Sequence, residues 1–446
     1  MSRCRGPAFR SQRSAREEGR KLSDGLDDWG GTEFVLAADR LDTLDVIEAA
    51  DPGDTLRQVA SSAAQVRTAL RSCQETDLSA FTPDARPRAI VAAGLGGSGL
   101  AGEMLQAVTG IGSPVQVVTA QAERLPGWVG AADAVIAVSC SGTTAETLAI
   151  ATEAARRGCR LVGVGARDSP LHRIAEQARA PFIPVVATGL PRSMLWGLAI
   201  PLLVIAERLG ITRIGPEVYE LTASRLEDVS RQCRPASESF VNPGKSLALD
   251  LVGALPVVWG TSELSSVAAR RFACQLSENA KYPAIAGVLP EAAHNQVAVF
   301  DGPFTPGTLP PPASSSPFAE AGAAGEPGSP PEAADEAAGL ADLSSWDLDY
   351  EEAQHGAVGG FTPLRLVLIS DPAQDQRVAA QQAAVTELAA QRGIGLSELA
   401  MDGERPLVRL AGVIQLADYA SVYLAIASGI DPGQTAVIGD LAARLE

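Results

Sequence analysis

Hydroxyl side chains gather in one short stretch, Ser139-Cys-Ser-Gly-Thr-Thr144, between an apolar run and a predicted helix. The run 133–138 is typical of a buried parallel strand, and residues 145–155 are good helix formers. Free backbone N–H groups and the positive end of the helix dipole favour a phosphate dianion at such a helix start. Ser139, Ser141 and Thr144 are therefore candidate phosphate ligands, with an ordinary Ser/Thr helix cap as the alternative.

A glycine-rich turn, Gly94-Leu-Gly-Gly-Ser-Gly99, follows a second apolar run and precedes another predicted helix. It fits the GxGxxG pattern of dinucleotide-binding proteins. The next predicted strand, 115–119, does not end in the acidic residue that would bind a ribose. We therefore favour a turn whose backbone approaches a sugar, with Ser98 as a further hydroxyl. A tight turn that needs glycine only for packing is the structural alternative.

Glu278 and His294 are the candidates for acid–base chemistry. Glu278 ends a predicted helix, 264–278, and faces the negative end of its dipole. That position favours proton uptake, as a general base working near neutral pH requires. His294 follows in the segment Leu289-Pro-Glu-Ala-Ala-His-Asn295. A solvated glutamate at a helix end and a histidine that only makes structural hydrogen bonds are the alternatives.

Strands and helices must alternate to position these groups. Strands are predicted at 88–94, 115–119, 134–139, 160–164 and 182–186, and again at 255–259, 297–300 and 364–370. Helices are predicted at 100–108, 145–155, 191–209, 217–233, 264–278, 373–392 and 408–428, after two shorter ones within 41–72. This alternation predicts an α/β fold with two units, each a parallel sheet flanked by helices.

The composition divides the chain into segments. We expect a disordered tail at 1–38, an N-terminal domain with leading helices at 39–234, and a C-terminal domain at 235–446. Within the second domain, residues 303–360 are rich in Pro, Ala, Gly and acidic residues and contain no Lys or Arg. Such a segment buries too little apolar surface to offset its ordering entropy, which predicts a disordered acidic insertion.

Charge and composition also bear on partners and location. The net charge of −17 argues against a nucleic-acid-binding surface. Six scattered cysteines and three histidines favour reduced thiols in a cytoplasmic protein and no metal site. We expect no membrane span, because the sequence indicates no apolar stretch of the ~18 residues that one needs.

Five blocks carry a resemblance that covers nearly the whole chain from about residue 40. They are GLGGSG at 94–99, SCSGTTAET at 139–147, GLPRSMLWG at 189–197, ENAKYPA to LPEAAHN across 278–295, and IDPGQTAVIGDLAARL at 430–445. In order and spacing they resemble the sugar isomerase (SIS) superfamily, and specifically the bifunctional phosphoglucose/phosphomannose isomerase family.

The resemblance implies two SIS-type units and the aldose–ketose isomerisation of glucose 6-phosphate or mannose 6-phosphate with fructose 6-phosphate. It implies that Glu278 moves a proton between C1 and C2 through a cis-enediolate, which Arg192 stabilises. His294 would assist ring opening from the partner subunit of a homodimer. No metal or cofactor is implied. The implied substrate contacts are Ser98, Ser139, Ser141 and Thr144 at the phosphate, with Gly97 and Thr435 elsewhere on the substrate.

One position departs from the family pattern. The family usually carries a lysine seven residues after the tail threonine, where this chain has Ala442. The alternative function is therefore a sugar-phosphate-binding or regulatory SIS protein with weakened catalysis. An NAD-dependent enzyme is a third, weaker reading of the glycine-rich turn.

Overall fold

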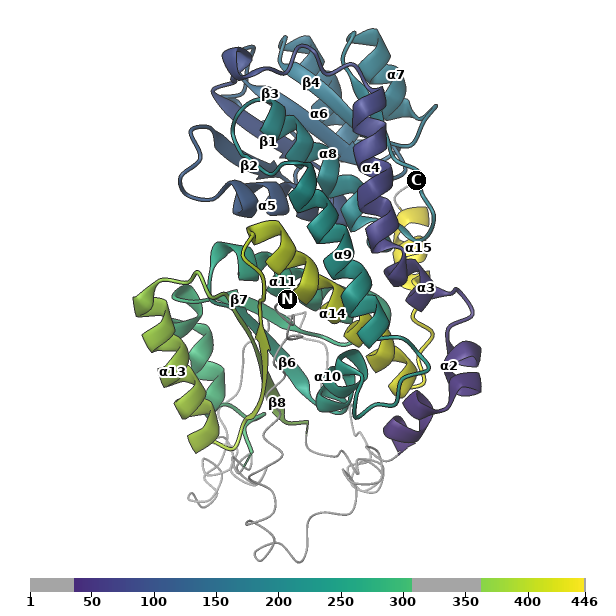
Figure 1. The fold of residues 1–446 in the computed structure, drawn as a ribbon, viewed down its shortest axis with the longest axis vertical. Helices are drawn as coiled ribbons and strands as arrows, with labels where there is room; N and C mark the ends of the chain where they lie inside the picture. Colours follow the sequence, from purple (N-terminus) through teal and green to yellow (C-terminus); the bar gives the residue numbers. More distant parts are fainter. Residues whose placement is uncertain (1–35, 307–361, 445–446) are drawn as a thin grey trace, which may run out of the picture.

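The computed structural model describes residues 36–306 and 362–444. The predicted tail and the predicted acidic insertion fall almost entirely outside the described residues. Two parallel sheets organise what is described, one in each half of an elongated molecule (Figure 1). The predicted α/β class is confirmed.

The first sheet has five strands in the order β2-β1-β3-β4-β5. Their bounds are Ala89–Ala93 (β1), Gln116–Ala120 (β2), Ala134–Ser139 (β3), Arg160–Gly165 (β4) and Phe182–Pro184 (β5). All neighbours are parallel, and Ala92 lies opposite both Thr119 and Ile136. The helices of this half are α5 (Gly97–Thr109), α6 (Ala145–Arg156) and α7 (Pro170–Gln177). β1 and β3 are buried along their whole length, as central parallel strands require.

The second sheet has four parallel strands in the order β7-β6-β8-β9. Their bounds are Leu255–Gly260 (β6), Ile285–Val288 (β7), Leu364–Ser370 (β8) and Gly395–Ala400 (β9). The sequence analysis did not predict β7 or β9. Its predicted strand at 297–300 is wrong, because residues 296–301 form the 3-10 helix η6 (Gln296–Asp301). Three residues per turn place Val297 and Phe300 on one face, where they pack on the core beneath the sheet.

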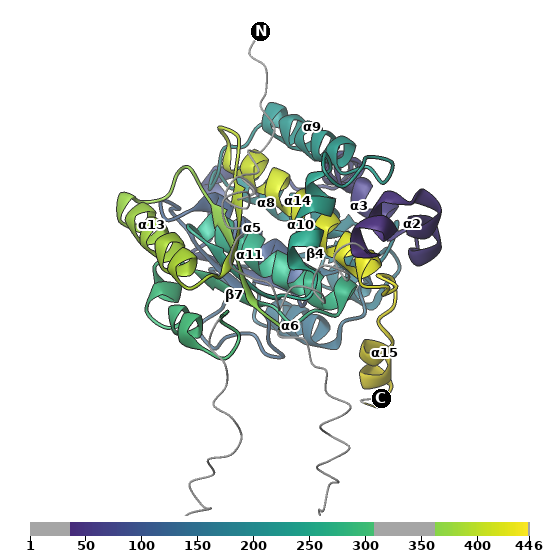
Figure 2. The same ribbon diagram turned by 90° about the horizontal axis from the view of Figure 1, so that it is seen from below.

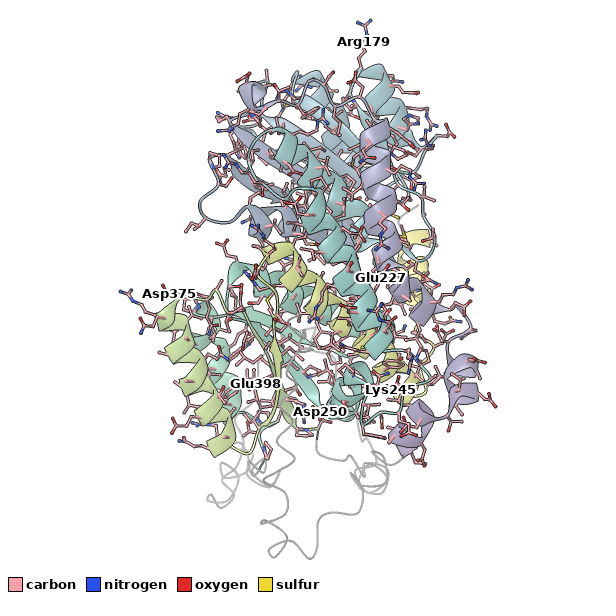
Figure 3. All side chains as sticks on the ribbon, viewed as in Figure 1. Arg179, Glu227, Lys245, Asp250, Asp375 and Glu398 are labelled. Carbon is pink, nitrogen blue, oxygen red and sulfur yellow. The ribbon has the colours of Figure 1, made fainter. Side chains whose placement is uncertain are left out.

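Long helices join the halves. They are α4 (Ser62–Glu75), α8 (Leu195–Arg208), α9 (Pro216–Gln232), α10 (Pro243–Leu251), α11 (Glu263–Gln275) and α14 (Pro406–Ala427). Arg67 of α4 pairs with Glu220 and Glu227 of α9, at 2.7 and 2.5 Å; Figure 3 labels Glu227 midway along the molecule. The remaining helices are α2 (Leu44–Ala50), α3 (Thr55–Ala60), α13 (Gln376–Gln391), α15 (Ala436–Ala443) and the short η2 (Pro83–Ala85).

The apolar core is continuous between the halves. One cluster of buried side chains extends from Ile90 of the first sheet, through α8 and α9, to Val367 of the second. Helix α14 lies at its centre. Its 22 residues are long and apolar enough to cross a membrane, which corrects the expectation that no stretch reaches that length, but its most apolar window is completely buried. α14 therefore has the character of a core helix.

The last helix has a different setting. Figure 2 shows α15 standing away from the body at the end of the loop that follows α14. Its side chains Val437, Ile438 and Leu441 are 79%, 57% and 59% exposed. The helix therefore presents an apolar face that the described part of the chain does not cover.

Candidate functional site

The strand order explains why the two hydroxyl-bearing turns meet. The chain passes from β1 to β2 on one side and returns to β3 on the other, so the sheet reverses its strand order between β1 and β3. Ligands of open parallel sheets bind outside the carboxyl ends of the strands at such a point. The turn after β1 leads to Ser98, and the turn after β3 carries Ser139 to Thr144. The strand order alone therefore brings these candidate ligands together at the carboxyl ends of β1 and β3.

The turn after β3 is shaped from inside by Ser139. This side chain is 1% exposed, and its hydroxyl lies 2.8 Å from the Thr144 hydroxyl and accepts the Gly142 N–H at 3.0 Å. Ser141 and Thr143, whose hydroxyls are 2.8 Å apart, are exposed instead. The four hydroxyls therefore divide into an inner pair that fixes the loop and an outer pair that faces solvent at the start of α6.

Gly142 is the pivot of this loop. Its φ is +69°, and a Cβ built there would lie 2.1 Å from Ser169 Oγ. Only glycine combines this left-handed conformation with such a close approach. With Gly142 packed in this way, the hydroxyls of Ser141 and Thr143, which flank it in the sequence, lie 2.8 Å apart.

The glycine-rich turn is shorter than predicted, because α5 already begins at Gly97. Ser98 therefore lies in the first helical turn, 9% exposed. A Cβ at Gly94 would come within 2.9 Å of both Ser98 and the Val138 carbonyl, so glycine is also needed here for close packing. A Cβ at Gly97 would lie 3.6 Å from the Pro191 carbonyl. This places the start of α5 beside the segment that carries Arg192.

Arg192 lies in the 3-10 helix η3 (Pro191–Ser193), which precedes α8 where one continuous helix was predicted. It is 7% exposed. Its Nε donates to Asn279 Oδ1 at 2.8 Å, and its Nη2 donates to the carbonyls of Pro432 and Gly433 at 2.6 and 3.2 Å. Burial lowers the pKa of Arg192 and the charge of Glu278 opposes that shift, but a guanidinium stays protonated. Among the described residues, Nη1 has no hydrogen-bond partner.

Glu278 lies on the π-helical turn η4 (Leu276–Ala280), which continues α11. It was predicted to end a regular helix; the wider turn instead re-aims the side chains at the helix end, a feature often found at functional sites. Glu278 is half-buried. Its carboxylate interacts electrostatically with Arg192 and with Lys281. The candidate base therefore lies beside two cations.

Lys281 closes this turn in a left-handed conformation, with φ +60°. Its Nζ donates to the carbonyls of Glu278, Asn279 and Asp431, at 2.9, 3.1 and 3.4 Å. Burial and the nearby charge of Arg192 lower the pKa of Lys281. All three N–H donors of the ammonium group bind backbone carbonyls. Lys281 therefore links the π-turn to the C-terminal segment.

A buried ion pair between α11 and α14 lies next to the site and contacts the backbone of Arg192. Arg271 of α11 donates to both carboxylate oxygens of Asp418 on α14, at 2.9 and 3.0 Å, and both side chains are at most 5% exposed. Arg271 Nη2 also donates to the Arg192 carbonyl at 2.6 Å. Asn279 is held from the same side, since its Nδ2 donates to Ser421 Oγ at 2.9 Å.

Two predicted site residues are not brought into this cluster. His294 follows the 3-10 helix η5 (Glu291–Ala293) and is exposed, and among the described residues its side chain has no hydrogen-bond or ion-pair partner. Thr435 is half-buried immediately before α15, two residues after the Gly433 carbonyl that binds Arg192. Position 442, where the resembling family usually has lysine, lies on α15.

Sequence reasoning missed Lys281, Arg271 and Asp418. Lys281 was quoted in a motif, but nothing in its surroundings along the chain indicates that it binds the tail, 150 residues away. Asp418 carried one local signal: it is a charge within an otherwise apolar stretch of a predicted helix, and a charge buried there requires a partner. Arg271 carried none, because the exposed Arg270 stands beside it in the sequence. As for metals, the described ranges contain no group of three His, Cys, Asp or Glu side chains placed to hold an ion.

Known proteins resemble this chain in sequence over about half of its length. Residues 240–445 match the model of the bacterial phosphoglucose isomerase C-terminal SIS domain. A bifunctional phosphoglucose/phosphomannose isomerase of Caldicellulosiruptor bescii is 30% identical over 214 residues, 48% of this chain and 63% of that one. A protein of the same name from Aquifex aeolicus is 30% identical over 220 residues, with the same coverage. A D-glucosamine-6-phosphate 4-epimerase of Sulfolobus acidocaldarius is 29% identical over 209 residues, 46% of this chain and 62% of that one.

The aligned region thus spans less than two thirds of each of these relatives. Solved structures extend the likeness of the fold to nearly the whole chain. A hypothetical protein of Thermus thermophilus has a TM-score of 0.59 at 15% identity, covering 93% of this chain and 94% of that one. A glucose-6-phosphate isomerase of Chlamydia trachomatis has a TM-score of 0.60 at 13% identity, covering 94% and 86%. Residues 240–445 therefore resemble the bacterial phosphoglucose isomerase C-terminal SIS domain, and the fold of nearly the whole chain is similar to that of these solved structures.

Proposed function

We propose that this protein interconverts the 6-phosphates of glucose or mannose, or of both, with fructose 6-phosphate. The observation that carries the proposal is the position of Glu278, a half-buried carboxylate with no hydrogen-bond partner among the described residues, next to the fixed guanidinium of Arg192. A base beside a permanent cation suits a reaction in which a proton leaves carbon and negative charge develops on an adjacent oxygen.

The phosphate would bind at the turn after β3. Ser141 and Thr144 lie at the start of α6, where backbone N–H groups and the helix dipole attract a dianion. Ser139 fixes that loop, and Ser98 and Gly97 lie on the adjoining first turn of α5. Thr435 would contact the substrate from the tail.

The proton transfer would then run through Glu278. With the sugar ring open, the carboxylate removes the proton from C2 of the aldose, the C1 carbonyl oxygen gains negative charge, and a cis-enediolate forms. Arg192 Nη1 would donate to that oxygen. The proton of the C2 hydroxyl passes to the C1 oxygen and the same carboxyl group returns a proton to C1, which leaves a carbonyl at C2, gives the ketose and restores the base, so no redox partner is consumed. Because C2 is planar in the intermediate, glucose and mannose phosphates share one path.

His294 would assist ring opening across a subunit interface, with the protein acting as a homodimer. Its exposure and the uncovered apolar face of α15 support that proposal. A cytoplasmic location agrees with the free thiols of the five described cysteines. The family position usually filled by lysine is Ala442, on α15, and this favours the second candidate, a protein that binds sugar phosphates and turns them over weakly.

A coupled assay of fructose 6-phosphate formation from glucose 6-phosphate and mannose 6-phosphate tests the proposal. Turnover that Glu278→Gln abolishes, and that Glu263→Gln at the exposed far end of α11 leaves intact, supports the isomerase. No turnover, combined with thermal stabilisation by a hexose 6-phosphate that Ser141→Ala removes, supports the binding protein. Absence of both effects contradicts both candidates.

A further inference from the structure

Arg192 lies on the loop that connects β5 to α8. Two glutamines of the leading helices α3 and α4 form hydrogen bonds to this loop. Gln58 of α3 accepts the Leu190 N–H at 2.7 Å, and Gln65 of α4 donates from Nε2 to the Ser193 carbonyl at 2.8 Å. These bonds fall on either side of Arg192. The leading helices thus reach the site although they contribute no group to it.

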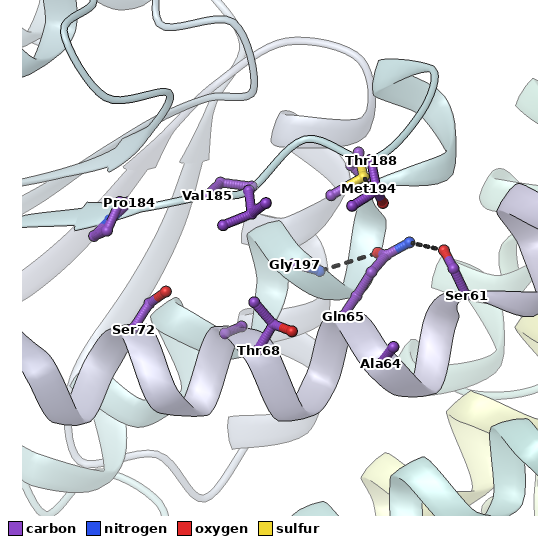
Figure 4. A pocket seen from close by; sticks show the side chains of 12 residues that line it. Ser61, Ala64, Gln65, Thr68, Ser72, Pro184, Val185, Thr188, Met194 and Gly197 are labelled. Atoms are coloured by element: carbon purple, nitrogen blue, oxygen red, sulfur yellow. Dashed lines mark hydrogen bonds between the residues drawn. The ribbon is translucent and has the colours of Figure 1, made fainter.

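Gln65 is the more deeply placed of the two, at 6% exposure. Besides binding Ser193, its Nε2 donates to Ser61 Oγ at 3.1 Å, and its Oε1 accepts the Gly197 N–H at 3.3 Å. Gly197 lies in the first turn of α8, where an N–H group has no partner within the helix. One amide group therefore fixes both the last residue of η3 and the first turn of α8; Figure 4 shows its bonds to Gly197 and Ser61.

The loop has space to move if this amide is lost. A cavity of about 150 Å³ lies between α4 and the loop, and its lining includes Gln65, Thr68, Met194 and Gly197. Figure 4 shows Gln65 crossing this space from α4 to Gly197, whereas Thr68, further along the same helix, makes no drawn bond to the loop. Packing alone therefore does not fix the loop on this side.

We propose that Gln65 is a positioning residue for Arg192, acting through the Ser193 carbonyl and the Gly197 N–H. It contacts no substrate. The inference rests on the proposed function, since it assumes that Arg192 stabilises the enediolate. A displacement of about 1 Å can reduce catalysis by 10²-fold. Without Gln65, Arg192 keeps its bonds to Asn279 and the tail, but the loop behind it is free to shift.

The test compares Gln65→Met with Thr68→Val. Methionine has a similar size and removes both hydrogen bonds to the loop, together with the one to Ser61 within the leading helices; Thr68 lines the same cavity without bonding the loop. We expect Gln65→Met to lower kcat by 10- to 100-fold with KM within three-fold, because the phosphate contacts lie elsewhere. Thr68→Val should keep both constants within two-fold. A kcat within two-fold of wild type in Gln65→Met, or a loss expressed mainly in KM, overturns the inference.

Amide hydrogen exchange provides a readout that needs no turnover. In Gln65→Met, residues 189–197 should exchange at least ten-fold faster than in wild type, whereas Thr68→Val should match wild type. Unchanged protection of these amides overturns the inference even if kcat falls. If wild-type protein turns over no hexose 6-phosphate, the proposed function fails, and the exchange rates still decide whether Gln65 anchors the loop.

Discussion

Individual residues in the turn after β3, residues 139–144, are constrained by space as much as by chemistry. Ser139 is engaged within its own loop, so its hydroxyl supports the ligand site from inside, whereas Ser141 presents its hydroxyl to solvent. The sequence predicted this turn because hydroxyls and glycine between a strand and a helix form a local signal. It could not predict how closely the loop packs, because Gly142 lies against Ser169, which follows the next strand along the chain.

Gly142 gives a direct prediction at this scale. Gly142→Ala should destabilise the protein more than Gly158→Ala, although both positions have φ near +70°. Alanine at Gly158 meets open space and costs only the left-handed strain, about 1–2 kcal/mol. At Gly142 the new methyl group also meets Ser169, so the loop must move and hexose 6-phosphate affinity should fall. Urea denaturation and calorimetric titration measure both effects; equal costs and unchanged affinity would show that the loop tolerates a side chain.

Cys274 reports on the charge of Glu278. Burial, and after it the Glu278 carboxylate, raise the pKa of the Cys274 thiol. Glu278→Gln removes the negative neighbour, lowers that pKa and should speed iodoacetamide modification of Cys274 at pH 8 by about two- to five-fold. Peptide mass spectrometry measures the rate. Glu291→Gln, on the exposed helix η5, is the control and should leave the rate unchanged. An unchanged rate in Glu278→Gln would show that the Glu278 carboxylate does not influence the Cys274 thiol.

Among the elements, α11 and its π-turn matter most for the site. The pattern of residues 264–278 correctly predicted a helix there but not the change of winding at Leu276, because hydrophobic periodicity does not distinguish an α-turn from a π-turn at a helix end. The edge strand β7 was missed for a similar reason: its four residues are too short to show alternation. The long strands β1, β3, β6 and β8 were predictable because their apolar runs are continuous.

The ion pair between α11 and α14 predicts a strong and asymmetric effect on stability. Arg271→Met leaves the buried Asp418 carboxylate unpaired and should cost about 3–5 kcal/mol. The double variant Arg271→Met with Asp418→Leu should recover most of that loss, because it removes the buried charge as well. Denaturation midpoints in urea measure this.

Arg156→Met, which breaks an exposed pair with Glu153, is the matched control and should change the midpoint little. A double variant as unstable as Arg271→Met alone would mean that the arginine, rather than the unpaired carboxylate, determines the cost.

At the scale of the whole molecule, the two halves share one core, and the proposed site draws on both. The proposed phosphate ligands lie on the turn after β3 of the first sheet, Glu278 belongs to the second half, and Arg192 is bound to both Asn279 and the tail. The order of the motifs along the chain could be predicted, as could the two-sheet architecture. The tail contacts could not, because they join residues 240 positions apart through backbone carbonyls that carry no sequence signal.

The exposure of His294 makes subunit complementation a test of the proposed homodimer. Glu278→Gln and His294→Asn should each be nearly inactive alone. If His294 acts across the interface, mixed dimers contain one intact site, and a randomised equal mixture should regain about a quarter of wild-type activity. Activity of the mixture is measured after subunit exchange. Failure to regain activity in mixed dimers would place both groups in the same protomer's site.

The central claim, proton transfer by Glu278 through an enediolate, is tested most directly by isomerisation in heavy water. Wild-type protein with glucose 6-phosphate or mannose 6-phosphate should form fructose 6-phosphate and introduce deuterium at C1 of the ketose and C2 of the aldose, followed by NMR. Glu278→Gln should do neither. Fructose 6-phosphate that gains no deuterium even after many reversals at equilibrium, or deuterium introduced equally by Glu278→Gln, would contradict this account.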